Sequence, residues 1–243
     1  MNPPKINCAA VICAAGASSR MGDGIKKEYR SLGEGGLTVL GAAVSAFAAI
    51  PEIQTIVITV PDDPKTGESA ARNALPPGFF AEGGVPALLF VSGGATRQAS
   101  VFNALSLLAG CAPDFVLIHD GARPWVSPSL IMRVIAEVQI HRAVIPLLPL
   151  AETPKETDAP LTGINTVFVK HHLKRAFVGA AQTPQAFAFA EIFAAHQKAA
   201  AQKPLDRAEF TDDAEIWGAF YGPVAAIPCD PENRKITFPE DIA

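Results

Sequence analysis

The sequence predicts an α/β protein whose mostly parallel sheet is covered by helices on both faces. Short apolar runs alternate along the chain with longer segments of helical periodicity. The apolar runs carry almost no polar positions, which is typical of parallel strands buried on both faces. The chain has 243 residues, of which 49% are hydrophobic, and this suits one large domain. We therefore expect a single domain over 1–243, with ligands bound beyond the carboxyl ends of the strands.

The individual elements follow from the same patterns. β-branched and other apolar residues indicate strands, whereas helices begin near serine or threonine caps and end at glycine or proline. Strands are expected at 9–13, 55–60, 87–92, 115–120, 143–150, 224–229 and 234–238. Helices are expected at 37–50, 97–110, 127–140, about 188–202 and 211–220.

The stretch 149–172 breaks the alternation of strands and helices. It contains prolines and polar turns, followed by an alternating, strand-like run. We expect a protruding β-arm at about 149–172 rather than a second domain. The expected fold is thus a Rossmann-like, mostly parallel sheet with helices on both faces and a β-arm.

Composition excludes several classes of protein. A net charge of −4 argues against a general nucleic-acid surface, which depends on an excess of basic residues. No apolar run approaches the roughly 18–20 residues needed to span a bilayer, and the N-terminus does not resemble a signal peptide. Four scattered cysteines form no CxxC pair, which argues against a zinc site or a disulfide framework. We therefore expect a soluble, cytoplasmic protein without nucleic-acid or membrane partners.

The loop after the first predicted strand is the first candidate site. It reads AAGASSR at 14–20, where Gly16 permits close approach of an anion and successive amides can form a nest. Two serine hydroxyls and the guanidinium group of Arg20 can donate hydrogen bonds to phosphate oxygens. Lys26 and Lys27 add positive charge farther along the chain. The spacing matches neither GxxxxGK[ST] nor GxGxxG. The loop is typical of a triphosphate site, although an ordinary βα turn with surface basic residues would also explain it.

A second candidate follows the third predicted strand, in SGGATRQAS at 92–100. Gly93 and Gly94 permit close backbone contact with a base or ribose, and Ser100 in the first helical turn can donate a hydrogen bond. A simple helix cap is the alternative interpretation of this motif taken alone.

A third candidate, IHDGARPW, ends the fourth predicted strand. Asp120 is placed to hold Mg²⁺, which takes one or two protein carboxylates besides phosphates and waters. Arg123 is placed to bind a second anionic group. The alternative is that Asp120 caps a turn and pairs with Arg123. We interpret His119 as a packed, hydrogen-bonded histidine rather than a ligand.

The remaining candidates are dispersed over the arm and the C-terminal part of the chain. They are Thr153, Arg175, Thr183 and Lys235, each unremarkable by itself. The AQTPQAF stretch that contains Thr183 is less ordinary, because two glutamines around Thr-Pro make a turn rich in hydrogen-bonding groups.

Taken together, the motifs resemble a known family. AAGASSRMG…KKEY, GGATRQAS, HDGARP, AQTPQAF, TDDA and NRKITFPED occur in the order and approximate spacing of 2-C-methyl-D-erythritol 4-phosphate cytidylyltransferases, over nearly the whole chain. The resemblance implies a nucleotidyltransferase fold and an enzyme of isoprenoid precursor biosynthesis. Such an enzyme joins CTP to the sugar-alcohol phosphate and releases pyrophosphate. The resemblance also implies a divalent metal, usually Mg²⁺, and a homodimer formed through the arm.

The resemblance also assigns roles to individual residues. It implies catalytic roles for Arg20, Lys27 and Lys235. It implies nucleotide binding by Ala14, Ala15, Gly16, Gly94 and Ser100. It implies substrate binding by Asp120, Arg123, Thr153, Arg175 and Thr183, with Asp120 also near the metal. The chain departs from the family at Ala95, where relatives often carry an acidic residue beside the base, and in the atypical KHHLKRAF stretch around Arg175.

Two alternatives to this function stay open on the sequence. Ribitol-5-phosphate cytidylyltransferases share HD-x-x-RP and QTPQ-type motifs, although SRMG…KKEY favours the methylerythritol substrate. A non-catalytic nucleotide sensor would use the same fold, but the presence of Arg20, Lys27, Asp120 and Lys235 argues against it. A nicotinamide-dependent dehydrogenase is disfavoured because GxGxxG is absent from the sequence.

Overall fold

The computed structural model describes residues 6–18, 21, 25–33, 36–63, 65–80, 86–161, 166–202 and 210–242. An eight-stranded sheet forms the centre, in the order β10-β5-β9-β4-β1-β2-β3, with β8 paired to β5. The strands are β1 (Cys8–Cys13), β2 (Ile53–Val60), β3 (Ala87–Ser92), β4 (Phe115–Asp120), β5 (Ala143–Pro149), β8 (Gly179–Ala181), β9 (Gln185–Ala188) and β10 (Ala225–Pro228). The pairs β1–β2, β1–β4, β2–β3 and β10–β5 are parallel, whereas β8 and β9 run antiparallel to their neighbours. The predicted mostly parallel α/β fold is therefore confirmed.

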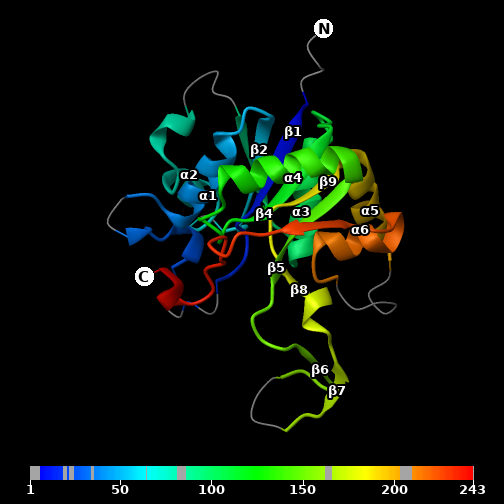
Figure 1. Cartoon of the computed structure of the whole chain (residues 1–243). Helices are drawn as coiled ribbons and strands as arrows, with labels where there is room; N and C mark the ends of the chain where they lie inside the picture. Colours follow the sequence, from blue (N-terminus) through cyan, green and yellow to red (C-terminus); the bar gives the residue numbers. More distant parts are fainter. Residues whose placement is uncertain are drawn as a thin grey trace.

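Helices cover both faces of the sheet (Figure 1). They are α1 (Val39–Ala48), α2 (Glu68–Asn73), α3 (Arg97–Leu108), α4 (Pro128–His141), α5 (Phe189–Ala201) and α6 (Asp213–Tyr221). Short 3-10 turns lie at Lys27–Tyr29, Pro77–Phe80, Arg175–Phe177 and Pro239–Ile242. Within the described part of the chain, none of the helices is both long and apolar enough to cross a bilayer.

Strand β1 shows why the sheet needs two helical layers. Cys8, Ala10 and Ile12 pack with apolar residues of α1 and α4, whereas Ala9 and Val11 pack with those of α3, α5 and α6. Successive strand side chains point to opposite faces, so a strand that is apolar at every position must be covered twice. All five side chains are fully buried.

Polar caps fix where the major helices begin. Thr38, Thr96, Ser127 and Asp212 each accept a hydrogen bond from the amide three residues ahead, at 2.9–3.1 Å. Such caps satisfy amides that the first helical turn leaves unpaired, and each typically stabilises a helix by about 1 kcal/mol. The cap at Thr96 places the first turn of α3 directly after the glycine pair that follows β3.

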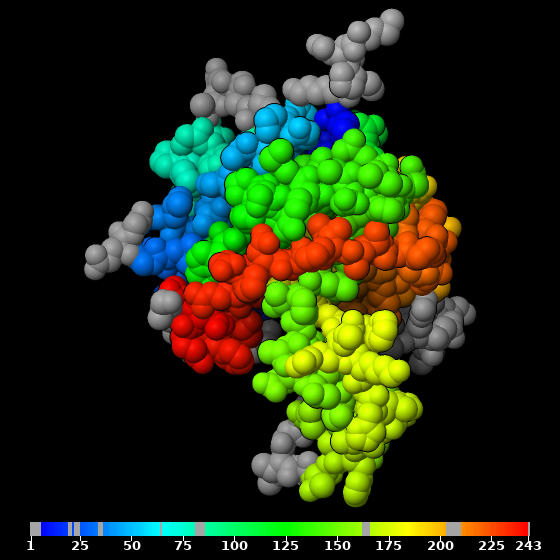
Figure 2. Space-filling view, viewed as in Figure 1, coloured from blue at the N-terminus to red at the C-terminus, as the bar shows by residue number. Residues whose placement is uncertain are grey.

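The arm is a two-stranded antiparallel sheet that projects from the body (Figures 1 and 2). Strand β6 (Lys155–Thr157) pairs with β7 (Val169–His172), inside the stretch 149–172 where the sequence predicts an arm. Phe168 and Phe177, at the tip and the base, are 73% and 85% exposed. Figure 2 also shows the C-terminal segment, orange to red, crossing one face between α4 and the arm.

The sequence analysis missed one strand of the sheet and wrongly predicted another. The stretch 181–187 contains a turn, but it continues into β9, which lies between β4 and β5. Conversely, 234–238 is not a strand. Ile236 donates one backbone hydrogen bond to Ala122, at 2.8 Å, and no ladder follows. The segment lies along the loop after β4, where it has a single backbone bond rather than a neighbouring strand.

Candidate active site

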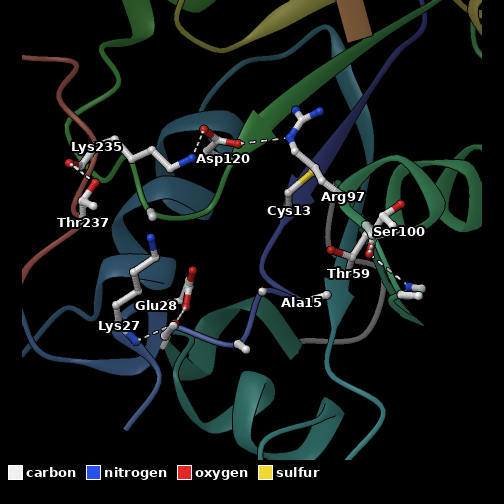
Figure 3. A pocket seen from close by; sticks show the side chains of 17 residues that line it. Cys13, Ala15, Lys27, Glu28, Thr59, Arg97, Ser100, Asp120, Lys235 and Thr237 are labelled. Carbon is white, nitrogen blue, oxygen red and sulfur yellow. Dashed lines mark hydrogen bonds and ion pairs between the residues drawn. The ribbon is translucent and has the colours of Figure 1, made fainter. Parts of the chain in front are cut away.

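A hollow of about 480 Å³ opens at the carboxyl ends of β1, β2 and β4 and at the start of α3 (Figure 3). The C-terminal segment closes one side of it. Residues predicted from widely separated motifs line this hollow together: Ala15, Gly16, Lys27, Gly94, Ser100, Asp120 and Lys235. The hollow lies where a parallel sheet is expected to bind ligands. Arg20, the remaining residue predicted to be catalytic, lies outside the described residues.

Asp120 is the charged centre of the hollow. Lys235 Nζ lies 2.8 Å from Asp120 Oδ2, and the Nε atoms of Arg97 and Arg123 lie 3.6 Å from the carboxylate. Lys235 and Arg97 approach the carboxylate from opposite sides (Figure 3). Burial by itself would raise the pKa of Asp120, but Lys235 and the two arginines outweigh it and hold the pKa well below its usual range. Asp120 therefore stays ionised and aligns three cations.

Arg97 is a residue of this site that the sequence reasoning missed. It is the first residue of α3, it lines the hollow, and its Nη1 donates to Asp213 Oδ2 at 2.8 Å. Asp213 is the main cause of a raised pKa for Arg97. The sequence offered one signal, an arginine directly after a capping threonine at the carboxyl edge of the sheet. Its carboxylate partner on α6 could not be identified from the sequence.

The loop after β1 is held from inside the protein by a buried ion pair. Lys26 Nζ donates to the carbonyl of Gly16 and lies 3.5 Å from Glu28 Oε2. Ser18 Oγ donates to the same Glu28 oxygen at 3.1 Å, and Ser18 has a φ of 52°, in the left-handed region. Burial lowers the pKa of Lys26. Lys26 thus supports the loop from inside, instead of offering its charge to a ligand as the sequence suggested.

Lys27 faces the hollow next to the C-terminal segment. Its Nζ donates to the Ile236 carbonyl at 2.9 Å, and its backbone amide donates to Ser18 Oγ at 3.4 Å. The predicted catalytic lysines, Lys27 and Lys235, therefore lie on the same side of one hollow, both beside the C-terminal segment (Figure 3).

The glycine pair after β3 leaves no room for a side chain. A Cβ on Gly94 would lie 2.4 Å from the Ala99 Cβ, and one on Gly93 would lie 2.3 Å from the Ala15 Cβ. The Gly94 amide donates to Ser100 Oγ at 3.0 Å, and that hydroxyl donates to the Thr96 carbonyl at 2.9 Å. Ser100 therefore shapes the loop that would face a base or ribose.

Three predicted residues lie beneath the hollow rather than on its surface. Ala14 is fully buried, and Arg123 donates to the Asn233 carbonyl at 2.7 Å. Thr183 Oγ1 accepts from the Asp120 amide at 3.1 Å and lies 3.0 Å from His119 Nδ1. These contacts hold Asp120 and the C-terminal segment in place from the buried side of the hollow.

His119 is the packed histidine that the sequence predicts. It is fully buried, its ring lies 5.0 Å from that of Phe47, and its Nε2 lies 3.1 Å from the Arg123 carbonyl. Because the Arg123 carbonyl can only accept, Nε2 of the neutral ring carries the proton, and Thr183 Oγ1 donates to His119 Nδ1. Burial lowers the pKa of His119 to about 4, so the ring is neutral.

Thr153 and Arg175 lie on the arm, away from the hollow of their own chain. Arg175 donates to the Ala151 carbonyl and lines a separate depression with residues of β5 and the arm base. One chain therefore does not bring these two residues to Asp120.

The residues present do not build a dedicated metal site. Among the residues that the structure describes, no cluster of three or more His, Cys, Asp or Glu could hold a metal ion. Asp120 supplies a single carboxylate, and Lys235 already occupies one of its oxygens. A metal at Asp120 would compete with three cations.

The fold and the hollow define a class of protein: an α/β protein of the nucleotidyltransferase type, with a glycine-containing loop, two lysines and a central carboxylate in one hollow. The family model for 2-C-methyl-D-erythritol 4-phosphate cytidylyltransferase matches residues 8–243. The chain belongs to this family.

Similar proteins agree with this assignment. The bifunctional enzymes IspD/IspF of Nitrobacter hamburgensis and Bradyrhizobium sp. are 40% and 41% identical over 240 and 236 residues. These matches cover 98% and 96% of this chain but 54% of each relative, so the chain spans about half the length of the curated relatives it matches.

Two solved structures match over nearly their whole length. The 4-diphosphocytidyl-2C-methyl-D-erythritol synthase of Anaerococcus prevotii is 27% identical with a TM-score of 0.78, over 98% of this chain and 93% of that one. The 2-C-methyl-D-erythritol 4-phosphate cytidylyltransferase of Thermus thermophilus is 30% identical with a TM-score of 0.65, over 96% and 94%.

Proposed function

We propose that this chain transfers a cytidylyl group from CTP to 2-C-methyl-D-erythritol 4-phosphate. The products are 4-diphosphocytidyl-2-C-methyl-D-erythritol and pyrophosphate, in the synthesis of isoprenoid precursors. The observation that best supports this proposal is the meeting of Lys27, Asp120 and Lys235 in one hollow, although they come from three distant segments. Membership of the family supports the choice of substrates.

The reaction needs positioning and charge neutralisation more than proton transfer. A phosphate oxygen of the sugar alcohol attacks the α-phosphorus of CTP, and the bond from that phosphorus to pyrophosphate breaks. The attacking oxygen is already anionic, so no general base is required. The enzyme must hold two anions that repel each other and neutralise the charge that develops.

Lys27 and Lys235 have the geometry for this task. They are held at the Ile236 carbonyl and the Asp120 carboxylate respectively, so each ammonium group is positioned before the substrates arrive. Donors fixed in advance stabilise a transition state because they need no reorganisation during the reaction. Asp120 contributes by orienting Lys235 and by reducing repulsion among the neighbouring cations.

We propose a divalent metal, Mg²⁺, as the cofactor that accompanies the triphosphate. Bound to phosphate oxygens, Mg²⁺ would neutralise part of the charge on the leaving pyrophosphate. With only one carboxylate available, this proposal gives most of the metal ligands to the nucleotide and water. Loss of turnover on chelation, restored by added Mg²⁺, would support it. Full activity in the presence of a chelator would exclude it.

We also propose a homodimer joined through the arms. Leu161 and Phe168 are 80% and 73% exposed on the arm, which favours contact with a partner. In such a dimer the arm would carry Thr153 and Arg175 to the hollow of the other protomer, where Arg175 would bind the sugar-alcohol phosphate. Light scattering of the purified chain measures its mass, and a monomer at working concentration would contradict this proposal.

Net charge and free cysteines indicate the cellular compartment that we propose for this protein. The net charge of −4 offers no general attraction for nucleic acid or anionic membranes. The four cysteines are free thiols, which suits a reducing cytoplasm. We therefore propose a cytoplasmic enzyme whose partners are CTP, the sugar-alcohol phosphate and a second copy of the chain.

A pyrophosphate-release assay tests the function directly. CTP and Mg²⁺ are supplied with 2-C-methyl-D-erythritol 4-phosphate, with ribitol 5-phosphate or with neither, and the product is identified by mass. We expect turnover with the methylerythritol substrate alone. Faster turnover of ribitol 5-phosphate would favour the rival substrate, and CTP binding without turnover would favour a nucleotide sensor.

A further inference from the structure

Asp213 is a carboxylate outside the hollow that is connected to it through Arg97. It is the first residue of α6, and its side chain is fully buried. Its Oδ2 accepts from Arg97 Nη1 at 2.8 Å, and its Oδ1 lies 3.1 Å from His196 Nε2. Arg97 Nε in turn lies 3.6 Å from Asp120 Oδ1. Asp213, Arg97, Asp120 and Lys235 thus form a row of alternating charges that leads from α6 to the hollow.

We propose that Asp213 is a positioning residue for the reaction, because it fixes Arg97 and, through Arg97, the orientation of Asp120 and Lys235. This inference rests on the proposed function. Asp213 cannot touch a substrate, since its side chain has no exposed surface. Arg97, by contrast, has a side chain that is 33% exposed at the hollow.

The geometry of Arg97 explains why it needs a buried anchor. An arginine on the first turn of a helix has several rotatable bonds, and a partly exposed guanidinium can adopt several rotamers. Contact with two carboxylates through different nitrogens selects one orientation of the planar fork. Asp213 makes the shorter of these contacts and is itself held by packing, so it sets where the guanidinium meets Asp120.

Capping of α6 does not account for Asp213. The capping of α6 is done by its neighbour Asp212, whose Oδ1 accepts from the Glu215 amide at 2.9 Å. A buried carboxylate costs free energy unless it is paired, and an apolar side chain would fill the same space. Burial would raise the pKa of Asp213, yet Arg97 and His196 together outweigh it and the pKa is lowered, so the charge persists.

The two adjacent aspartates provide a matched experiment. Asp213→Asn removes the charge next to Arg97, while Asp212→Asn makes the same chemical change one residue away and keeps a good capping side chain. For Asp213→Asn we expect kcat with CTP and 2-C-methyl-D-erythritol 4-phosphate to fall by about 10- to 100-fold, as displaced catalytic groups do. KM for CTP should change less, since Asp213 touches no substrate. For Asp212→Asn we expect kcat close to wild type.

A double-mutant cycle tests whether the effect passes through Arg97. If it does, the variant carrying both Asp213→Asn and Arg97→Gln has about the same kcat as Arg97→Gln alone. Losses that multiply would overturn the inference, as would a folded Asp213→Asn variant with wild-type kcat. Should Asp213→Asn fail to fold, Arg97→Gln decides, because normal kcat in that variant excludes any route through Arg97 and a loss supports it. Absence of turnover by the wild type would instead refute the proposed function.

Discussion

Replacing Lys235 with methionine should separate catalysis from stability. The change removes the ammonium group that lies 2.8 Å from Asp120 and keeps a long, unbranched side chain. In the proposed reaction Lys235 stabilises charge on the α-phosphate. Removing one such donor typically costs about 3–4 kcal/mol of barrier, so kcat should fall roughly 10²–10³-fold.

The expected cost in stability is small, for reasons that the structure gives. The Lys235 side chain is 39% exposed, and ion pairs with that much solvent contact contribute only about 0–1 kcal/mol. Asp120 is not left unpaired, because Arg97 and Arg123 remain 3.6 Å away. For a chain of this size a loss of 1 kcal/mol lowers Tm by about 2–4 °C. Thermal denaturation should therefore give nearly the wild-type curve.

The assay is pyrophosphate release with saturating CTP and the methylerythritol substrate, alongside thermal denaturation of the same preparation. Lys198→Met is the matched control, since Lys198 lies on α5 over the Tyr221 ring, 4.9 Å from its centroid and away from the hollow. Near-normal kcat in the folded Lys235→Met variant would refute the catalytic role. A strongly lowered Tm for this variant would contradict the expectation that Lys235 serves catalysis and contributes little to stability.

Three further predictions concern other parts of the site. Lys27→Ala should lower kcat by roughly 10²–10³-fold while the fold survives, and steady-state kinetics with circular dichroism would check this; normal turnover would dismiss its role. Glu28→Gln should weaken the hold on Ser18 and raise KM for CTP, whereas an unchanged KM would show that the loop does not need the Lys26–Glu28 pair. The pKa of His119 is about 4 in the folded chain and 6.5 when unfolded, so its stabilising contribution is complete above pH 6.5 and declines as the pH falls toward 4. Urea denaturation should find the free energy of unfolding about 3 kcal/mol lower at pH 4 than at pH 6.5, and a flat dependence would contradict a buried neutral ring.

The parallel core could be predicted because its signals are local. The run CAAVIC is apolar on both faces, which already requires two covering layers. The caps at Thr96 and Ser127 mark the starts of their helices through contacts that span only four residues of sequence. Strand β9 lacks such signals. Gln185–Ala188 is short and follows Thr-Pro, and it becomes a strand only because β4 and β5, both distant in sequence, leave a place between them.

The site likewise combines features that local sequence signals predict with features that only tertiary packing determines. Lys235 reaches Asp120 although its segment is not the predicted strand, because hydrogen bonds to Ala122, Arg123 and Lys27 hold an extended chain beside the loop. The pairing of Arg97 with Asp213 could not be predicted, since either of two adjacent aspartates fits the motif and only tertiary packing shows which one turns inward. Lys26 and Lys27 likewise cannot be distinguished in the sequence. In the fold, Lys26 turns inward beneath the loop, whereas Lys27 faces the hollow.

The root of the arm is joined to the site by a short length of chain. Strand β8 ends at Ala181, and only two residues later Thr183 receives the backbone amide of Asp120. The base of the hairpin and the hydroxyl that receives the Asp120 amide are therefore joined by only two residues of chain. A substitution at the root of the arm thus lies close in sequence to the group that holds the end of β4.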